Sequence, residues 1–246
     1  NKCGNDWQAV ALMARGTGMH FTSQLRNPVK KQQVYKPQLP LISRDIRLDN
    51  ALYLGDLGSM ENAPLKGDRI NLVKRAIIDH GGVTVTLFMP DDCAKYFNTK
   101  TNSYYCHRYS EQDHSHSIVL AGWDDNYSRK NFVTDPGGDG AWLVRDSAGD
   151  NWSGMGYYYI SYRLPSLAGG VAYDCSIAYA NERIYQYDPL GCTYYLEMDT
   201  DKIFFANMFT AEGNDTVYAA AFYVPLANAD YTVSVCRGCT KGPNSG

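Results

Sequence analysis

The chain has 246 residues, of which 44% are hydrophobic and 20% are charged, so it can bury a sizeable core as one large domain or two smaller ones. Its formal net charge of -3, with no basic run longer than Lys30-Lys31, disfavours nucleic acid as a partner. No apolar stretch approaches the ~20 residues of a membrane-spanning helix.

Two helices are predicted in the first third of the chain. The first covers residues 6 to 15, where apolar residues recur at the spacing of one buried helix face: Trp7, Val10, Ala11 and Ala14. A second helix is predicted around Leu72 to Ile77, and it ends at Gly81-Gly82, where a left-handed conformation is favoured. Between them, residues 17 to 67 contain four prolines and predict mostly loop and short strand.

Strands dominate the rest of the chain. Residues 83 to 89 alternate apolar and polar side chains and stop at Pro90, as expected of a half-buried strand. Further strands are predicted at 116 to 123, 141 to 146, 156 to 162, 203 to 209, 217 to 224 and 230 to 236. Helices first and strands later indicate the α+β fold class.

Three segments carry a functional pattern. The first is Cys3-Gly4-Asn5-Asp6-Trp7, and the second begins at His116 with an apolar run that ends in Gly122-Trp123. The third runs from Gly140 to Tyr157. In this order and at these spacings, the segments resemble the nucleophile, histidine and asparagine motifs of papain-like cysteine peptidases. The resemblance is greatest to the secreted bacterial and archaeal type, in which a lectin-like domain follows the peptidase.

The resemblance implies a two-lobed α+β domain over residues 1 to 180, with a helical lobe and a β-barrel lobe that meet at a cleft. The family's N-terminal strand is expected to be missing. Residues 181 to 246 are expected to be the start of a lectin-like β-sandwich that is truncated. The family register also implies a disulfide between Cys3 and a later cysteine, for which Cys93 and Cys106 are the two candidates.

The candidate catalytic residues are Asp6, His116 and Asp146. Asp6 stands where the family has its nucleophilic Cys, and Asp146 stands where it has the Asn that orients the imidazole. A carboxylate keeps the negative charge of the thiolate but not its nucleophilicity, so peptide hydrolysis by the family's route is expected to be lost. The plain alternative for Asp6 is a helix cap. The resemblance adds Gly4, Trp7 and Trp152 as substrate-binding residues.

Three functions follow from this pattern. The leading one is a secreted or cell-surface pseudopeptidase that binds peptide or protein in its cleft, and whose C-terminal domain could bind a cell-wall or surface glycan. The second is an active cysteine endopeptidase whose nucleophile is altered or misassigned. The third is a structural surface-layer or adhesion component.

No metal or other cofactor is predicted. His114 and His116 lie on one face of a strand, but no third ligand is placed nearby in the sequence. Calcium is a weaker possibility at two acidic turns, Asp124 to Asn126 and Asp135 to Asp139, which lack the spacing of a calcium-binding loop. Solvated turns are the preferred interpretation of both.

Overall fold

The computed structural model describes residues 6–16, 19, 45–55, 57, 67–110, 112–147, 153–179, 182–188, 190–192, 194, 198–200, 202–224 and 229–240. Within them the helices are α1 (Asp6–Ala14), α2 (Gly67–His80) and the single turn α3 (Ser153–Gly156). The strands are β1 (Ile46–Tyr53), β2 (Val83–Met89), β3 (Phe97–Asn98), β4 (Ser103–Tyr104), β5 (His114–Asp124), β6 (Ala141–Arg145), β7 (Tyr157–Ser161) and β8 (Leu167–Ile177). Two short 3-10 helices, η3 (Cys93–Tyr96) and η4 (Arg129–Asn131), complete the set. The predicted α+β class is confirmed.

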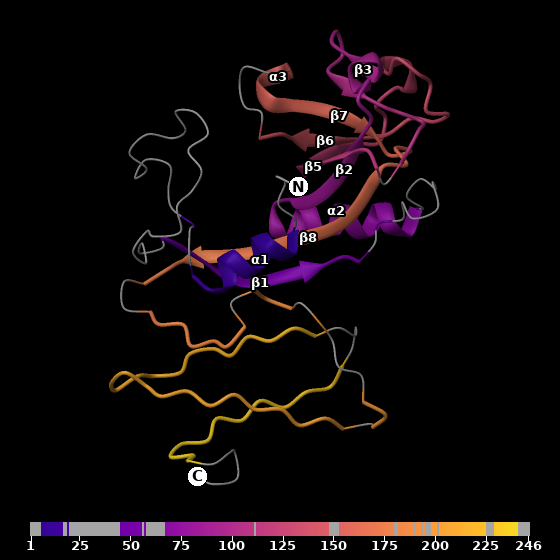
Figure 1. Cartoon of the computed structure of the whole chain (residues 1–246). Coiled ribbons are helices and arrows are strands. Elements are labelled where there is room, and N and C mark those ends of the chain that lie inside the picture. The colour runs from indigo at the N-terminus through magenta and orange to yellow at the C-terminus, as the bar shows by residue number, and fades with distance from the viewer. Residues whose placement is uncertain are drawn as a thin grey trace.

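All eight strands form one sheet in the order β1-β8-β2-β5-β6-β7-β4-β3 (Figure 1). Every neighbouring pair is antiparallel except β4 and β7, which run parallel. Strand β2 lies between β5 and β8, and Leu87 is paired with His116 on one side and Leu167 on the other. The middle of the sheet therefore connects the histidine motif to the last strand.

Helix α2 covers one part of this sheet. Val73, Ala76 and Ile77 are buried on one face, as the sequence predicted, whereas Leu72, expected on the same face, is 41% exposed. The helix contacts β2, β5 and β8. Gly81 follows with a φ of +85°, a conformation that glycine adopts without strain. The alternation predicted for residues 83 to 89 is confirmed, because Val83, Val85 and Leu87 are buried and the residues between them are only half-buried.

Strands β1 and β8 were not predicted. Residues 45 to 55 fall in the stretch expected to be mostly loop and short strand, without a strand assigned to them, and Ile46 to Tyr53 pair with Val171 to Ile177. Strand β8 contains Gly169 and Gly170, which have low strand propensity and concealed it in the sequence. A Cβ on Gly170 would lie 3.0 Å from Leu57, so close packing accounts for at least one of the two glycines.

The strands predicted at 203 to 209, 217 to 224 and 230 to 236 are not formed in the described residues, which have no regular secondary structure there. These segments run as long extended traces at the C-terminal end of the molecule (Figure 1). Aromatic contacts link them instead of a hydrogen-bonded ladder: Phe222 packs edge-on against Phe205 and Tyr231. Most of their side chains are exposed, including Phe204 at 93%.

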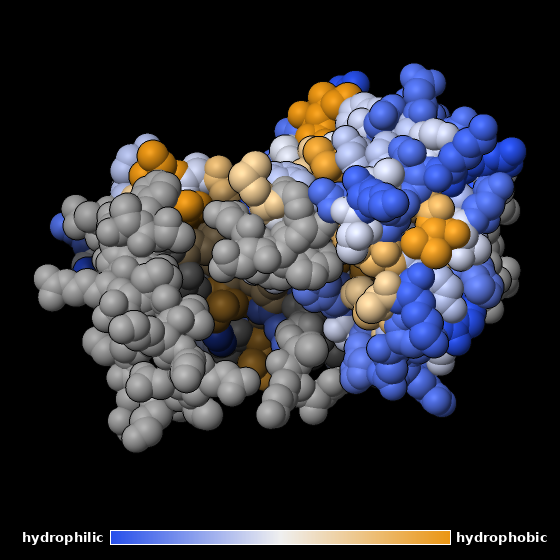
Figure 2. Space-filling view, turned by 90° about the horizontal axis from the view of Figure 1, so that it is seen from above, coloured by the Kyte–Doolittle hydropathy of each residue, from blue (hydrophilic) through white to orange (hydrophobic). Residues whose placement is uncertain are grey.

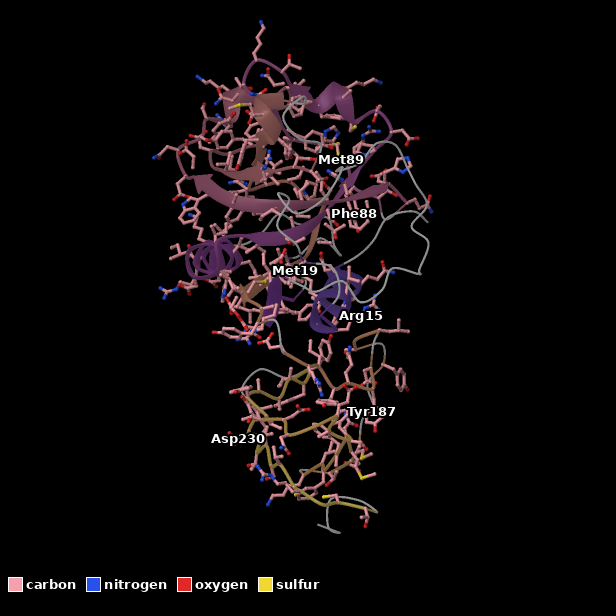
Figure 3. All side chains as sticks on the ribbon, turned by 90° about the vertical axis from the view of Figure 1, so that its left-hand side faces the viewer. Arg15, Met19, Phe88, Met89, Tyr187 and Asp230 are labelled. Carbon is pink, nitrogen blue, oxygen red and sulfur yellow. The ribbon has the colours of Figure 1, made fainter. Side chains whose placement is uncertain are left out.

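The C-terminal segment lies against α1. A Cβ on Gly191 would be 3.0 Å from the Cβ of Ala11 and 2.9 Å from the hydroxyl of Tyr223, so the chain passes very close to the helix. Figure 3 shows the same arrangement: Tyr187 and Asp230 lie beyond the α1 end of the molecule, which carries Arg15, and far from Phe88 and Met89 at the end of β2. The ion pair of Arg47 with Glu182 adds a link from β1.

One end of the molecule has a mostly polar surface. Seen from above, the described side chains over the end of the molecule that carries β3 are mostly hydrophilic, and hydrophobic ones form small separate spots (Figure 2). Among the described residues, no helix is both long enough and apolar enough to cross a bilayer.

Candidate active site

His116 and Asp146 form the centre of the candidate site. His116 is the third residue of β5, and Asp146 follows directly after β6, the next strand of the sheet. Their side chains meet with 2.9 Å between His116 Nε2 and Asp146 Oδ2. The backbone N–H of Asp146 donates to the carbonyl of Gly156, which fixes the carboxylate at the strand end. Sequence reasoning expected this pair, and the structure brings it together.

Tyr158 holds the Asp146 carboxylate from the protein interior. Its hydroxyl donates to Asp146 Oδ2 at 3.3 Å, and its ring packs edge-on against Phe97 with centroids 5.8 Å apart. Burial, with the adjacent Asp146 charge as the next cause, raises the pKa of the Tyr158 phenol above its usual range. Tyr158 therefore remains a neutral donor to Asp146 at physiological pH. This role could not be predicted from the sequence, because nothing distinguishes Tyr158 from its neighbours in a run of three tyrosines.

Asp6 occupies a different neighbourhood. It is the first residue of α1, and its Oδ2 lies 3.7 Å from the position of a Cβ on Gly169 of β8. Burial raises the pKa of the Asp6 carboxyl. Burial, with the nearby Asp6 charge as the next cause, raises the pKa of Tyr173 to about 12. Within the described residues, the ion pair of His116 is with Asp146 and none joins it to Asp6.

Trp7 is more exposed than the helical pattern predicted. Val10 and Ala11 are buried, whereas Trp7 is 42% exposed. The reason is an aromatic partner outside the helix: the indole stacks on Tyr53 with centroids 4.3 Å apart, and Tyr223 lies 6.5 Å away. Trp7 thus lies where α1, β1 and the C-terminal segment meet. The other two expected substrate-binding residues, Gly4 and Trp152, lie outside the described residues, as does Cys3.

A cavity of about 440 Å³ adjoins the start of β5, and sequence reasoning missed it. It is lined by Pro90, His107, Arg108, Tyr109, Ser110 and Asp113. Asp113 accepts a hydrogen bond from the backbone of Ser110, and the ring of Tyr109 packs edge-on against Phe88 of β2. Because the lining ends directly before His114, the cavity lies on the chain segment that leads into His116. The sequence signal was only the mixture of charged and aromatic residues before the histidine motif.

The residues considered for metal binding have other partners. His114 is paired with Asp91, so it does not share a partner with His116. At the acidic turns, the carboxylates of Asp124 and Asp135 accept hydrogen bonds from the backbone two residues on, at 2.8 Å each. Asp125 binds Lys74 and Tyr162. Among the described residues, no cluster of three or more His, Cys, Asp or Glu side chains is arranged to hold a metal ion.

Two family descriptions match the chain. Residues 58–180 match the papain family of cysteine proteases, and residues 184–246 match the lectin-like domain. The first match begins after the segment that contains Asp6. No curated protein sequence gives a significant match.

Solved structures agree on the fold. One is the clostridial cysteine protease Cwp84 after propeptide cleavage, with a TM-score of 0.58, 24% identity, and coverage of 74% of this chain and 43% of that chain. Another contains the cysteine protease and lectin-like domains of Cwp84, a surface layer associated protein of Clostridium difficile, with a TM-score of 0.56, 25% identity, and coverage of 72% and 38%. The chain thus spans less than half the length of these proteins.

Proposed function

We propose that this chain, which belongs to the papain family of cysteine proteases and carries a lectin-like domain, is a pseudopeptidase that binds peptide or protein segments without cutting them. The proposal places ligand binding beside His116 and in the cavity at the start of β5. It assigns Asp6 the position of the family's nucleophile.

The observation that carries the proposal is the residue at the start of α1. A cysteine peptidase needs a thiolate at this helix N-terminus, where the helix dipole and an imidazolium lower the thiol pKa. Here the residue is Asp6, and burial raises the pKa of its carboxyl. Attack of a carboxylate on an amide would form a high-energy mixed anhydride. In this proposal, α1 begins at Asp6 as the family's helix begins at its cysteine, and the nucleophile needed for peptide hydrolysis is lost.

Peptide binding is supported by the groups that remain. The His116 ring is held by Asp146 through Nε2, so Nδ1 is the ring nitrogen left to contact a ligand. The cavity before β5 offers an aromatic wall at Tyr109 and polar groups at Ser110 and Asp113. A peptide backbone, with alternating donors and acceptors, suits such a mixed lining.

Secretion or display at the cell surface is part of the proposal. The similar protein Cwp84 is described as surface layer associated, and this chain has the same succession of a papain-like and a lectin-like domain. Binding of a cell-wall or surface glycan through residues 184–246 would hold the chain at that location. The same domain also favours a second candidate function, a structural surface-layer or adhesion component.

A covalent probe tests the missing nucleophile. The full chain is incubated with an epoxysuccinyl peptide, which alkylates the active thiol of papain-like enzymes, and its intact mass is measured. We expect no adduct on the wild-type chain and one adduct on Asp6→Cys, with Asp6→Ala as the matched control that stays unlabelled. An adduct on any native cysteine of the wild type would overturn the proposal and establish an active endopeptidase with another nucleophile.

Fluorescein-labelled casein tests ligand binding with the same preparations. The pseudopeptidase should raise the anisotropy of the probe without releasing small fragments, and His116→Ala should weaken that binding. Fragment release would identify an active protease. Neither binding nor cleavage would contradict the peptide-binding proposal and favour the structural component.

A further inference from the structure

Two cysteines lie at the base of one short hairpin. Cys93 begins η3, which leads directly into β3, and Cys106 follows two residues after β4. The strands pair Phe97 with Tyr104, and the pairing continues outward through the hydrogen bond from the backbone of Tyr105 to the carbonyl of Tyr96. Cys93 and Cys106 therefore both lie at the open end of the hairpin, away from its turn.

Side chains near Cys93 contact side chains near Cys106. Arg108 forms an ion pair of 2.5 Å with Asp92, the residue before Cys93. The same guanidinium lies 5.3 Å above the ring of Tyr96, and that ring packs edge-on against His107, the residue after Cys106. Residues on either side of Cys93, within three positions of it, thus contact the two residues that follow Cys106.

The thiols also share a buried neighbour. Cys106 is fully buried, and Cys93 is partly buried against the same hydrophobic cluster. The side chain of Tyr104, which is 1% exposed, interacts with both: burial first, and then Cys106 and Cys93, raise the pKa of its phenol. Tyr104 belongs to the hairpin whose ends carry Cys93 and Cys106, whereas Cys175 is on β8, on the far side of β2, β5, β6 and β7.

We propose that Cys93 and Cys106 form a disulfide when the protein meets a thiol–disulfide oxidant. The partly exposed Cys93 thiolate attacks the oxidant, forms a mixed disulfide and expels one small thiolate. The Cys106 sulfur then attacks Cys93 from the interior, forms the protein S–S bond and expels the second small thiolate. The two protein thiols are oxidised, the oxidant is reduced to two thiols, and the two thiol protons go to those products. This inference is independent of whether the chain cleaves peptides.

The disulfide would restrict the motion of the residues that pack behind the candidate site. Phe97, at the start of β3, packs on Tyr158, and the Tyr158 hydroxyl binds the Asp146 carboxylate that orients His116. Closing the base of the hairpin restricts the movement of Phe97 and hence of Tyr158. The oxidised protein is therefore expected to hold Asp146 more rigidly than the reduced protein.

Peptide mapping tests the pairing. The full chain is treated with oxidised glutathione, alkylated, digested without reduction and analysed by mass spectrometry. We expect one cross-linked pair of peptides containing Cys93 and Cys106, two hydrogens lighter than the sum of the reduced peptides. Linkage of either residue to Cys3, the pairing that the family register implies, or to any other cysteine would overturn the proposal. So would alkylation of both thiols in oxidant-treated protein that keeps its native circular dichroism.

Thermal melting supplies a second readout. Oxidation should raise the melting temperature by roughly 5 to 10 °C, as expected for closure of a short loop in a domain of this size. Cys93→Ala should abolish that rise, and it is preferred over Cys106→Ala because its site is only partly buried. Cys175→Ala, the matched control on β8, should retain the full rise. A rise that survives in Cys93→Ala would contradict the proposed bridge.

Discussion

His116 Nε2 and Asp146 Oδ2 lie 2.9 Å apart, although the side chain of Asp146 is 3% exposed and that of His116 is 38% exposed. The buried carboxylate therefore orients a ring that reaches the surface. Tyr158 donates to the same oxygen from the interior, so Asp146 connects the core to the candidate site.

Replacing Asp146 tests this connection. Asp146→Ala leaves the Tyr158 hydroxyl buried without its acceptor and should lower the free energy of unfolding by roughly 1–3 kcal/mol. Asp146→Asn retains an oxygen acceptor and should be affected less. Chemical denaturation measures stability, and the proton NMR signals of His116 report whether its ring is still oriented. Equal destabilisation by both substitutions would show that the hydrogen bonds to Oδ2 do not matter.

The charge of Asp6 predicts a pH dependence. Burial raises its folded-state pKa above the ordinary value of 3.8, so the folded state keeps a proton that the unfolded chain releases. The associated stability is present below the unfolded pKa and is lost as the pH rises through the folded pKa. Asp6→Asn cannot ionise, so it should melt higher than the wild type at neutral pH, with a difference that disappears near pH 4.

Asp68→Asn is the matched control for this experiment. Asp68 also lies in the first turn of a helix, α2, but it is exposed. There the helix dipole favours the charge, so removing it should lower stability slightly. A gain in both variants, or a gain in neither, would contradict the role assigned to burial at Asp6.

Two tyrosines should respond to loss of the hydroxyl in opposite ways. Among the described residues, the buried Tyr53 hydroxyl has no hydrogen-bond partner, whereas the Tyr158 hydroxyl binds Asp146. Tyr53→Phe removes an unsatisfied polar group and should be neutral or stabilising by up to about 1 kcal/mol, while Tyr158→Phe should cost about 1 kcal/mol. Urea denaturation of the two variants measures both. Destabilisation by Tyr53→Phe would indicate that its hydroxyl has a partner in solution.

Gly191 should control the contact between the C-terminal segment and α1. Its φ is +74°, and a Cβ would lie 2.9 Å from the Tyr223 hydroxyl and 3.0 Å from Ala11. Gly191→Ala is expected to loosen this contact and expose the segment after residue 182 to limited proteolysis. Gly213→Ala is the control, because nothing lies within 4 Å of its Cβ position. Identical cleavage rates for both variants would count against close packing at Gly191.

Alanine substitutions at Gly140 and Gly137 distinguish the cost of backbone strain from the cost of steric overlap. Both have positive φ, +101° and +83°, so alanine is strained at each. Only at Gly140 would the new Cβ meet a ring, 2.5 Å from Tyr162, which packs against Trp142. Gly140→Ala should therefore be less stable than Gly137→Ala by about 1–3 kcal/mol. Thermal melting of the two variants tests this, and a smaller loss at Gly140 would contradict it.

The sequence was most informative where one local pattern decided the structure. The alternation from Val83 to Met89 depends on neighbouring residues alone, and the structure reproduces it with the same bounds. The His116–Asp146 pair could be anticipated because each residue lies in a recognisable motif. Strand β8 could not, since Gly169 and Gly170 break the local strand signal and only distant partners on β1 and β2 hold it in the sheet.

In the C-terminal segment, by contrast, strands were predicted that the described residues do not form. Its apolar and aromatic residues alternate as in strands, but alternation does not supply the hydrogen-bonded neighbours that a sheet requires. Likewise, the periodicity of α1 indicated a buried Trp7, whereas the indole stacks on Tyr53 of β1 and is 42% exposed. In both places the outcome depends on partners distant in the sequence.

The pairing of β1 with β8 has a consequence for biosynthesis. Ile46 to Tyr53 leave the ribosome long before Leu167 to Ile177, the only described segment with which they form a ladder. During translation β1 is therefore an unpaired edge, whereas β2 and β5 can already associate. Until β8 has been synthesised, β1 exposes unpaired backbone N–H and C=O groups. These groups can pair with other chains and promote aggregation.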